Sequence, residues 1–284
     1  MRHAVLLILV MCLPLVAATK TGPLGGHNEP AAVRGTYTVV ESYSVGLTSS
    51  YGLAIMDDQT NSIWISNYGL LKNNEFDMST GGATGNTFSI TGGVDPDDQG
   101  YCSYGGTTPS QFFFGNWSSS YVAVFDVSTT ESAVYYRGNI GGPAGWSTVC
   151  GVDAGHDNMY VSCFFADEIG WGAYTGTESS VTWTTADFDA VSGMAVWEDY
   201  LFVCCQIEGA DNIFIFQLNA DGSPDMTPVW SCNFTHSSAS AGGIDYDGSY
   251  LWLYPQNDNL FKLDIDWFPE ALDRQTWGAI KSSF

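Results

Sequence analysis

An internal repeat is the feature that most constrains the fold of this chain. Five stretches each open with a glycine, continue as a short hydrophobic run, pass through a polar turn, and reach an aromatic residue that precedes a hydrophobic one. The glycines, at positions 52, 100, 151, 193 and 243, stand 48, 51, 42 and 50 residues apart. Each stretch predicts two strands and a turn. The spacing matches the roughly 40 to 50 residues of a four-stranded propeller blade.

Two further strands follow the hairpin in most repeats. The third strand recurs as EFDMSTGG from Glu75, VFDVSTTE from Val124, IFQLNADG from Ile215 and KLDIDWFPE from Lys262, whereas the third repeat has GWGAYTGTE instead. A fourth strand follows, as in NTFSITG from Asn86. No segment longer than a turn shows helical periodicity, so we predict an all-β chain that forms a β-propeller of five four-stranded blades. The alternative, a six-bladed ring, needs a sixth repeat.

The repeat glycines have a structural explanation. The innermost strand of every blade runs beside the central axis, where glycine lets backbones approach one another closely. Two segments compete to complete the last blade beside residues 262–266. The alternating segment 36–46 (TYTVVESYSVG) joins the two ends of the chain if it takes this position, and QTWGAIK from Gln275 is the other candidate.

The first residues have the pattern of a secretory signal peptide. Basic residues precede an apolar run over 4–15, and Val16 and Ala18 stand where signal peptidase selects small residues. The run is shorter than the roughly 20 residues of a membrane-spanning helix. We therefore expect a secreted, periplasmic or cell-surface protein without a membrane span. Its parts are a signal peptide over 1–18, a flexible leader over 19–34 and a single propeller domain over 35–284.

Acidic residues dominate the charge of the chain. It has 31 Asp and Glu against 8 Lys and Arg, a formal net charge of −23 at pH 7. Such a chain repels nucleic acid and anionic lipid, so we expect neither as a partner. Only 14% of the residues are charged, so the imbalance reflects a shortage of basic residues. A solvated acidic surface explains it without any cofactor, and Ca²⁺ or another divalent cation is the alternative.

Six cysteines follow the predicted signal peptide, and an even number in an exported chain is compatible with disulfides. Cys150 and Cys163 flank one predicted hairpin and pair across it if its turn has two residues. Cys204 and Cys205 are neighbours on one strand and point to opposite faces, so at most one reaches Cys232. The alternative is that the cysteines are small buried hydrophobic side chains.

Loops between the predicted strands hold the candidate binding residues. In a propeller, the loops that lead into the innermost strands and those that join the second strand to the third surround the channel on one face. Carboxylates suit Ca²⁺, although DPDDQG from Asp95 has Gly106 where a Ca²⁺ loop has glutamate. Aromatic faces supply contact area. We predict that a monomer binds a protein or carbohydrate ligand through this face, using Asp95, Asp97, Asp98, Trp146, Trp171 and His236.

The repeat resembles those of secreted NHL-like and lactonase-like β-propellers. The shared pattern is a glycine, a short strand, a D-G-type turn, an L-W or Y-V pair and a third strand ending in D-x-x-T-G, and it covers residues 36–283. The resemblance implies an alternative function, that of a metal-dependent hydrolase. Lactonase-like propellers place Glu, Asn and Asp around a channel metal, which makes Asp153 and Asp245 candidate ligands. The other explanation is that each caps a turn or bonds backbone amides.

Exported five-bladed glutaminyl cyclases are a second family of similar size. Their glycine-tryptophan-glycine signature opens an innermost strand, whereas EIGWG at residues 168–172 follows a second strand here. We therefore set this resemblance aside. No nucleophile, base and orienting group stand at recognisable spacing, and no G-x-S-x-G elbow occurs. These observations favour binding over catalysis.

Overall fold

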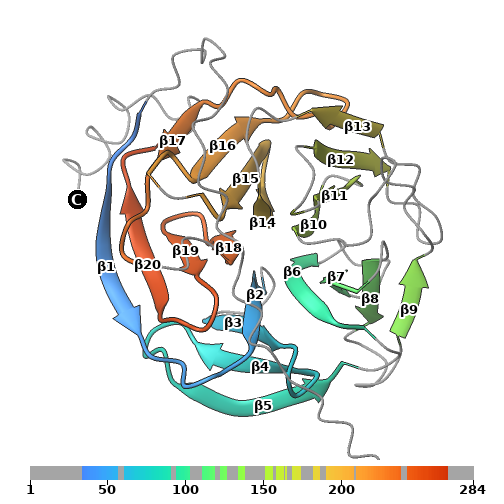
Figure 1. Cartoon of the computed structure of the whole chain (residues 1–284), viewed down its shortest axis with the longest axis vertical. Helices are drawn as coiled ribbons and strands as arrows, with labels where there is room; N and C mark the ends of the chain where they lie inside the picture. Colours follow the sequence, from blue (N-terminus) through green and yellow to red (C-terminus); the bar gives the residue numbers. More distant parts are fainter. Residues whose placement is uncertain are drawn as a thin grey trace, which may run out of the picture.

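The fold is a five-bladed β-propeller (Figure 1). The computed structural model describes residues 34–56, 61–90, 94–102, 111–118, 122–126, 134–137, 151–155, 158–162, 164, 168–173, 182–185, 190–207, 209–237 and 242–267. These residues contain twenty strands and no helix. The strands form five four-stranded antiparallel sheets, so the all-β fold and the five blades predicted from the repeat are confirmed. Within this part of the chain, no helix has the length and apolar character that a membrane crossing requires.

Each of the first four blades is continuous in sequence and adds its strands from the axis outward. Blade 1 contains β2 (Ser50–Ile55), β3 (Ser62–Asn67), β4 (Lys72–Asp77) and β5 (Ala83–Ser89). Blade 2 contains β6 (Pro96–Cys102), β7 (Gln111–Asn116), β8 (Val122–Asp126) and β9 (Val134–Arg137). Blade 3 contains β10 (Val152–Gly155), β11 (Asn158–Ser162), β12 (Glu168–Ala173) and β13 (Thr182–Thr185). Blade 4 contains β14 (Val191–Trp197), β15 (Tyr200–Cys205), β16 (Ile213–Gln217) and β17 (Trp230–Cys232).

Blade 5 joins the two ends of the described chain. Its inner strands are β18 (Gly243–Tyr246), β19 (Leu251–Tyr254) and β20 (Leu260–Ile265), and its outer strand is β1 (Tyr37–Tyr43). β1 runs antiparallel to β20, and Figure 1 shows the two side by side at the rim. The Thr36 backbone N–H and hydroxyl add hydrogen bonds of 2.8 and 2.9 Å to the Asp266 carboxylate. The segment 36–46 therefore closes the ring, and its competitor QTWGAIK lies outside the described residues.

The hydrophobic core is divided among the interfaces between blades. Five clusters of buried side chains each combine two neighbouring blades. The second strand of a blade serves both of its interfaces, because successive side chains point to opposite faces. Phe112 and Phe113 of β7 face different clusters, as do Cys204 and Cys205 of β15. The opposite orientation of these two cysteines is thus confirmed, and both are buried and form no disulfide bond, as is the case for Cys232.

Glycines bring the innermost strands into backbone contact where these strands begin. A Cβ on Gly243 would lie 2.3 Å from the Leu53 nitrogen and 2.8 Å from the Gly52 carbonyl carbon. A Cβ on Gly193 would lie 2.3 Å from the Gly242 oxygen. Side chains cannot fit at such distances, so close backbone approach explains the glycines at 193 and 243. A Cβ on Gly151 would instead first meet the Ser162 and Met194 side chains. We call this side of the channel the glycine end.

Candidate functional site

Asp98 occupies the glycine end of the channel. It lies within β6 and is fully buried, whereas the sequence placed it in a loop. Its Oδ2 accepts the N–H groups of Val152 at 3.2 Å and Met194 at 2.9 Å, which belong to blades 3 and 4. Its Oδ1 has no hydrogen-bond donor among the described residues. Burial raises the pKa of Asp98 well above its ordinary value, and the carboxyl links three blades at the axis.

Two neighbouring carboxylates of the predicted binding face have different surroundings. Asp95 precedes β6 and is half-buried, and its Oδ2 accepts the Ser118 hydroxyl at 2.7 Å. Asp97 lies within β6 with 5% of its surface exposed, and its backbone oxygen accepts the Ser66 hydroxyl at 3.0 Å. The structure therefore builds both residues into the framework around β6.

The aromatic members of that predicted face are spread over separate blades. Trp171 lies in β12, not in the loop before it, and packs half-buried at the interface of blades 3 and 4. His236 is exposed beside β1, with its Nδ1 2.9 Å from the Tyr37 hydroxyl. Trp146 lies outside the described residues, as do both members of the predicted Cys150–Cys163 disulfide. The binding role of this face stays a prediction.

Asp153 and Asp245 perform the same structural task at two interfaces. Asp153 Oδ2 accepts the Val196 N–H at 2.6 Å, and Asp245 Oδ2 accepts the Ile55 N–H at 2.6 Å. Each donor belongs to the innermost strand of the next blade. The backbone-amide explanation is thus confirmed for both residues. Among the described residues, no group of three or more His, Cys, Asp or Glu side chains is placed to hold a metal ion.

A pocket opens where the five innermost strands end, on the face opposite the predicted binding loops. Its volume is about 790 Å³, within the usual range for small-molecule sites. Every blade contributes to the lining, because the ends of β2, β6, β10, β14 and β18 meet there. Five aromatic side chains form part of its wall: Tyr101, Trp197, Tyr246, Tyr250 and Trp252. We call this side of the channel the pocket end.

The charged groups that line the pocket are mostly acidic. Four carboxylates, Asp153, Glu198, Asp245 and Asp247, stand against the single ammonium group of Lys262 among the described lining residues. Asp153 and Asp245 also hold neighbouring strands, whereas Glu198 is exposed on the turn between β14 and β15. The pocket therefore combines a negative formal charge with aromatic walls.

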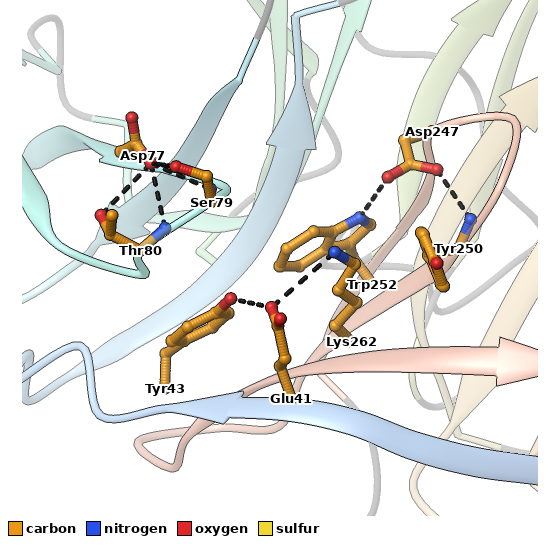
Figure 2. A network of polar contacts seen from close by, with 9 residues as sticks. All are labelled: Glu41, Tyr43, Asp77, Ser79, Thr80, Asp247, Tyr250, Trp252 and Lys262. Carbon is orange, nitrogen blue, oxygen red and sulfur yellow. Dashed lines mark hydrogen bonds and ion pairs between the residues drawn. The ribbon is translucent and has the colours of Figure 1, made fainter.

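Lys262 is held at the side of the pocket by groups from β1, from β19 and from the turn before β19 (Figure 2). Its Nζ lies 3.7 Å from Glu41 Oε2, and the Tyr43 hydroxyl donates to the same carboxylate. The ammonium group also lies 4.4 Å from the centre of the Tyr250 ring and 5.3 Å from that of Trp252. Such positions over aromatic faces attract cations. The closing strand β1 thus supplies the carboxylate of Glu41 that pairs with Lys262 beside the pocket.

Aspartates fix the turns at the pocket rim (Figure 2). Asp247 Oδ2 accepts the Trp252 indole N–H at 2.8 Å, and its Oδ1 accepts the Tyr250 backbone N–H at 2.7 Å. Asp77 accepts the Ser79 hydroxyl at 2.5 Å and the Thr80 backbone N–H at 3.0 Å. The hydrogen bond from the Ser79 hydroxyl is the leading reason why the pKa of Asp77 is lowered. These contacts give the aromatic wall a fixed geometry.

Comparison with solved structures extends the likeness to other propellers. The glutaminyl cyclase of Myxococcus xanthus has a TM-score of 0.58 at 9% identity, over 84% of this chain and 100% of that one. A structure from the nidogen/laminin complex has a TM-score of 0.51 at 10% identity, over 77% and 85%. The virginiamycin B lyase of Staphylococcus aureus has a TM-score of 0.45 at 14% identity, over 76% and 66%.

The two likenesses with TM-scores above 0.5 agree with the β-propeller fold. The resemblance of the repeat to NHL-like and lactonase-like propellers is confirmed at the level of this architecture. No protein family and no curated protein sequence matches the chain. The function has to be argued from the site, because one fold carries many functions.

Proposed function

We propose that this chain is an exported binding module whose protein ligand enters the pocket end of the channel. The observation that carries the proposal is the pocket of about 790 Å³ that all five blades build from aromatic and acidic side chains. A concave site with aromatic walls and a few placed polar groups is the usual form of a ligand site. The ring holds these groups on rigid strand ends, which favours binding through fixed contacts.

Trp197 provides the test of the pocket. It lies at the end of β14 with part of its surface exposed, and it packs edge-on against Tyr246 at 5.1 Å between ring centres. A ligand that enters the pocket meets this indole. We expect Trp197→Ala to weaken binding by about 1 to 3 kcal/mol, as truncation of an aromatic anchor does. Calorimetric titration with peptides and oligosaccharides, beside a thermal melt of each variant, measures both effects.

The same titration compares the two faces of the ring. The sequence predicted Trp171 and Trp146 as members of the loop face, and Trp171 is half-buried between blades 3 and 4. Loss of binding in Trp171→Ala or Trp146→Ala, with Trp197→Ala unchanged, would move the site to that loop face. Loss in Trp197→Ala alone supports the pocket. A melting temperature equal to that of the parent chain excludes misfolding as the cause.

The alternative function is a metal-dependent hydrolase that uses Asp153 and Asp245. Each of these side chains already gives one oxygen to a backbone N–H of the next blade. These contacts of both carboxylates in the described residues are explained by their structural role. Metal analysis of the purified protein, with esterase and lactonase assays of Asp153→Asn and Asp245→Asn, decides between the two functions.

A further inference from the structure

We infer that the ligand of the pocket presents a positively charged group, ammonium or guanidinium on a peptide side chain, and that Glu198 selects it. This inference rests on the proposed function, because it names the chemistry of the same site. It starts from the charges of the described lining residues, four carboxylates against one ammonium group. The chain around them has a formal net charge of −23, so its long-range field attracts cations and repels anions.

The pocket already holds one cation of its own. Lys262 Nζ lies over the Tyr250 ring at 4.4 Å and near the Trp252 ring at 5.3 Å, with Glu41 Oε2 at 3.7 Å. The Tyr250 and Trp252 rings and the Glu41 carboxylate therefore accommodate an ammonium group within the folded protein. Glu41 offsets the charge of this lysine, so Lys262 does not cancel the carboxylates on the other sides of the pocket. A second cation finds similar chemistry around Trp197, Tyr246 and Glu198.

Glu198 stands where the fold itself would favour glycine. Its φ is +47°, in the left-handed region that is costly for residues with a side chain. The position of Glu198 in the repeat of blade 4 corresponds to Gly248 in blade 5, and Gly248 has a φ of +86°. The same turn is thus built with glycine in one blade and with glutamate in its neighbour. The glutamate places an exposed carboxylate on the pocket lining at a cost to the backbone.

Replacing Glu198 distinguishes a binding role of its carboxylate from a structural one. Glu198→Gly removes the carboxylate and relieves the left-handed conformation, so the fold should melt at the same or a higher temperature while a cationic ligand binds less tightly. Glu198→Gln removes only the charge. The matched control is Asp225→Asn, which neutralises an exposed carboxylate outside the pocket lining and keeps the oxygen that accepts the Thr227 N–H.

The experiment is a calorimetric titration of the full chain at low salt, where charge interactions are least screened. The probes are triarginine and trilysine amides, spermidine, a neutral tetrasaccharide and triglutamate. We expect the two cationic peptides to bind. We expect Glu198→Gly and Glu198→Gln to weaken them about fivefold, with Asp225→Asn unchanged. If spermidine binds as tightly as the cationic peptides, the pocket selects free polyamines, and the proposal of a peptide ligand is overturned.

The remaining outcomes distinguish this inference from the proposed function. Cationic peptides that bind the Glu198 variants as tightly as the parent chain overturn the role of Glu198. Binding of the tetrasaccharide or triglutamate alone, weakened by Trp197→Ala, overturns the charge selection and leaves the pocket as the binding site. If no probe binds, both the inference and the proposed peptide-binding function fail.

Discussion

The two ends of the central channel use opposite ways of bringing five blades together. At the glycine end, glycines let innermost strands touch backbone to backbone, and the buried Asp98 accepts N–H groups from blades 3 and 4. At the pocket end, the same strands are tied by the Asp153 and Asp245 side chains, and aromatic rings surround a pocket. Close backbone contact leaves no space for a ligand, whereas side-chain links leave a pocket. One end therefore supplies rigidity and the other a surface for recognition.

The largest effect is expected from filling the glycine end. Gly243→Ala places a Cβ 2.3 Å from the Leu53 nitrogen, and backbone cannot move aside as a flexible side chain can. We expect a loss of about 3 kcal/mol or more in the free energy of unfolding, at the upper end for overpacking. Chemical denaturation measures it. The control is Gly82→Ala, whose Cβ would meet only the Thr80 hydroxyl at 3.3 Å. Equal losses in both variants would contradict the crowding argument.

A predicted disulfide would reinforce the glycine end at the third repeat. β10 and β11 pair with Val152 opposite Val161 and Gly155 opposite Asn158, the register that the sequence argument assumed. Cys150 directly precedes Gly151 in the sequence. We expect Cys150→Ser to lower the free energy of unfolding of the oxidised protein by about 2 to 3 kcal/mol. The variant and its parent should be equally stable under reducing conditions. Peptide mapping that finds Cys150 and Cys163 as free thiols would refute the disulfide.

The side-chain links of the pocket end can be removed one at a time. Asp153→Ala leaves the Val196 N–H without its acceptor, and we expect a loss of about 2 kcal/mol in the free energy of unfolding. Asp153→Asn retains an accepting oxygen and should lose clearly less. Denaturation of the two variants measures the difference. Similar stability of both variants and the parent would mean that this carboxylate does not hold blades 3 and 4 together.

The glycine end should also respond to pH through Asp98. Burial raises its pKa in the folded state, so the folded protein keeps a proton that the unfolded chain releases above about pH 4. Stability is therefore lost as pH rises from that value toward the raised pKa, by up to about 1.4 kcal/mol per pH unit. Asp98→Asn should remove this contribution, so its advantage over the parent chain grows with pH. Parallel stability profiles of the two proteins would contradict a protonated Asp98.

Local signals explain why the architecture was predictable. The repeat glycines and the alternating hydrophobic residues mark single hairpins, so their spacing along the chain predicts five blades. Asp153 and Asp245 each stand two residues after a repeat glycine, which identifies them as equivalent positions. Closure was not decided by the sequence, because two segments had suitable alternation and only the pairing with β20 distinguishes them.

The site was less accessible to sequence reasoning. The DPDD segment has turn-forming residues, but all except Asp95 lie in β6, which has a register shift between Pro96 and Gln99, and Asp98 is fully buried. The pocket draws its lining from five repeats, so no single motif marks it. A signal existed in the aligned turns, where Glu198 replaces the glycine of the fifth repeat. Its meaning depends on the positive φ, which only the structure supplies.

The contact between β1 and β20 has a consequence for the order of folding. Thr36 and Asp266 are 230 residues apart in the chain, whereas neighbouring repeats are separated by about 50. Closing the longer loop costs only about 1.4 kcal/mol more in chain entropy, a small penalty on stability. Contacts this distant form slowly, however, and they dominate the folding rate of β proteins. Of the described strands, β1 is the first to leave the ribosome and β20 is the last, and until the two pair, their edges are open to pairing with other chains.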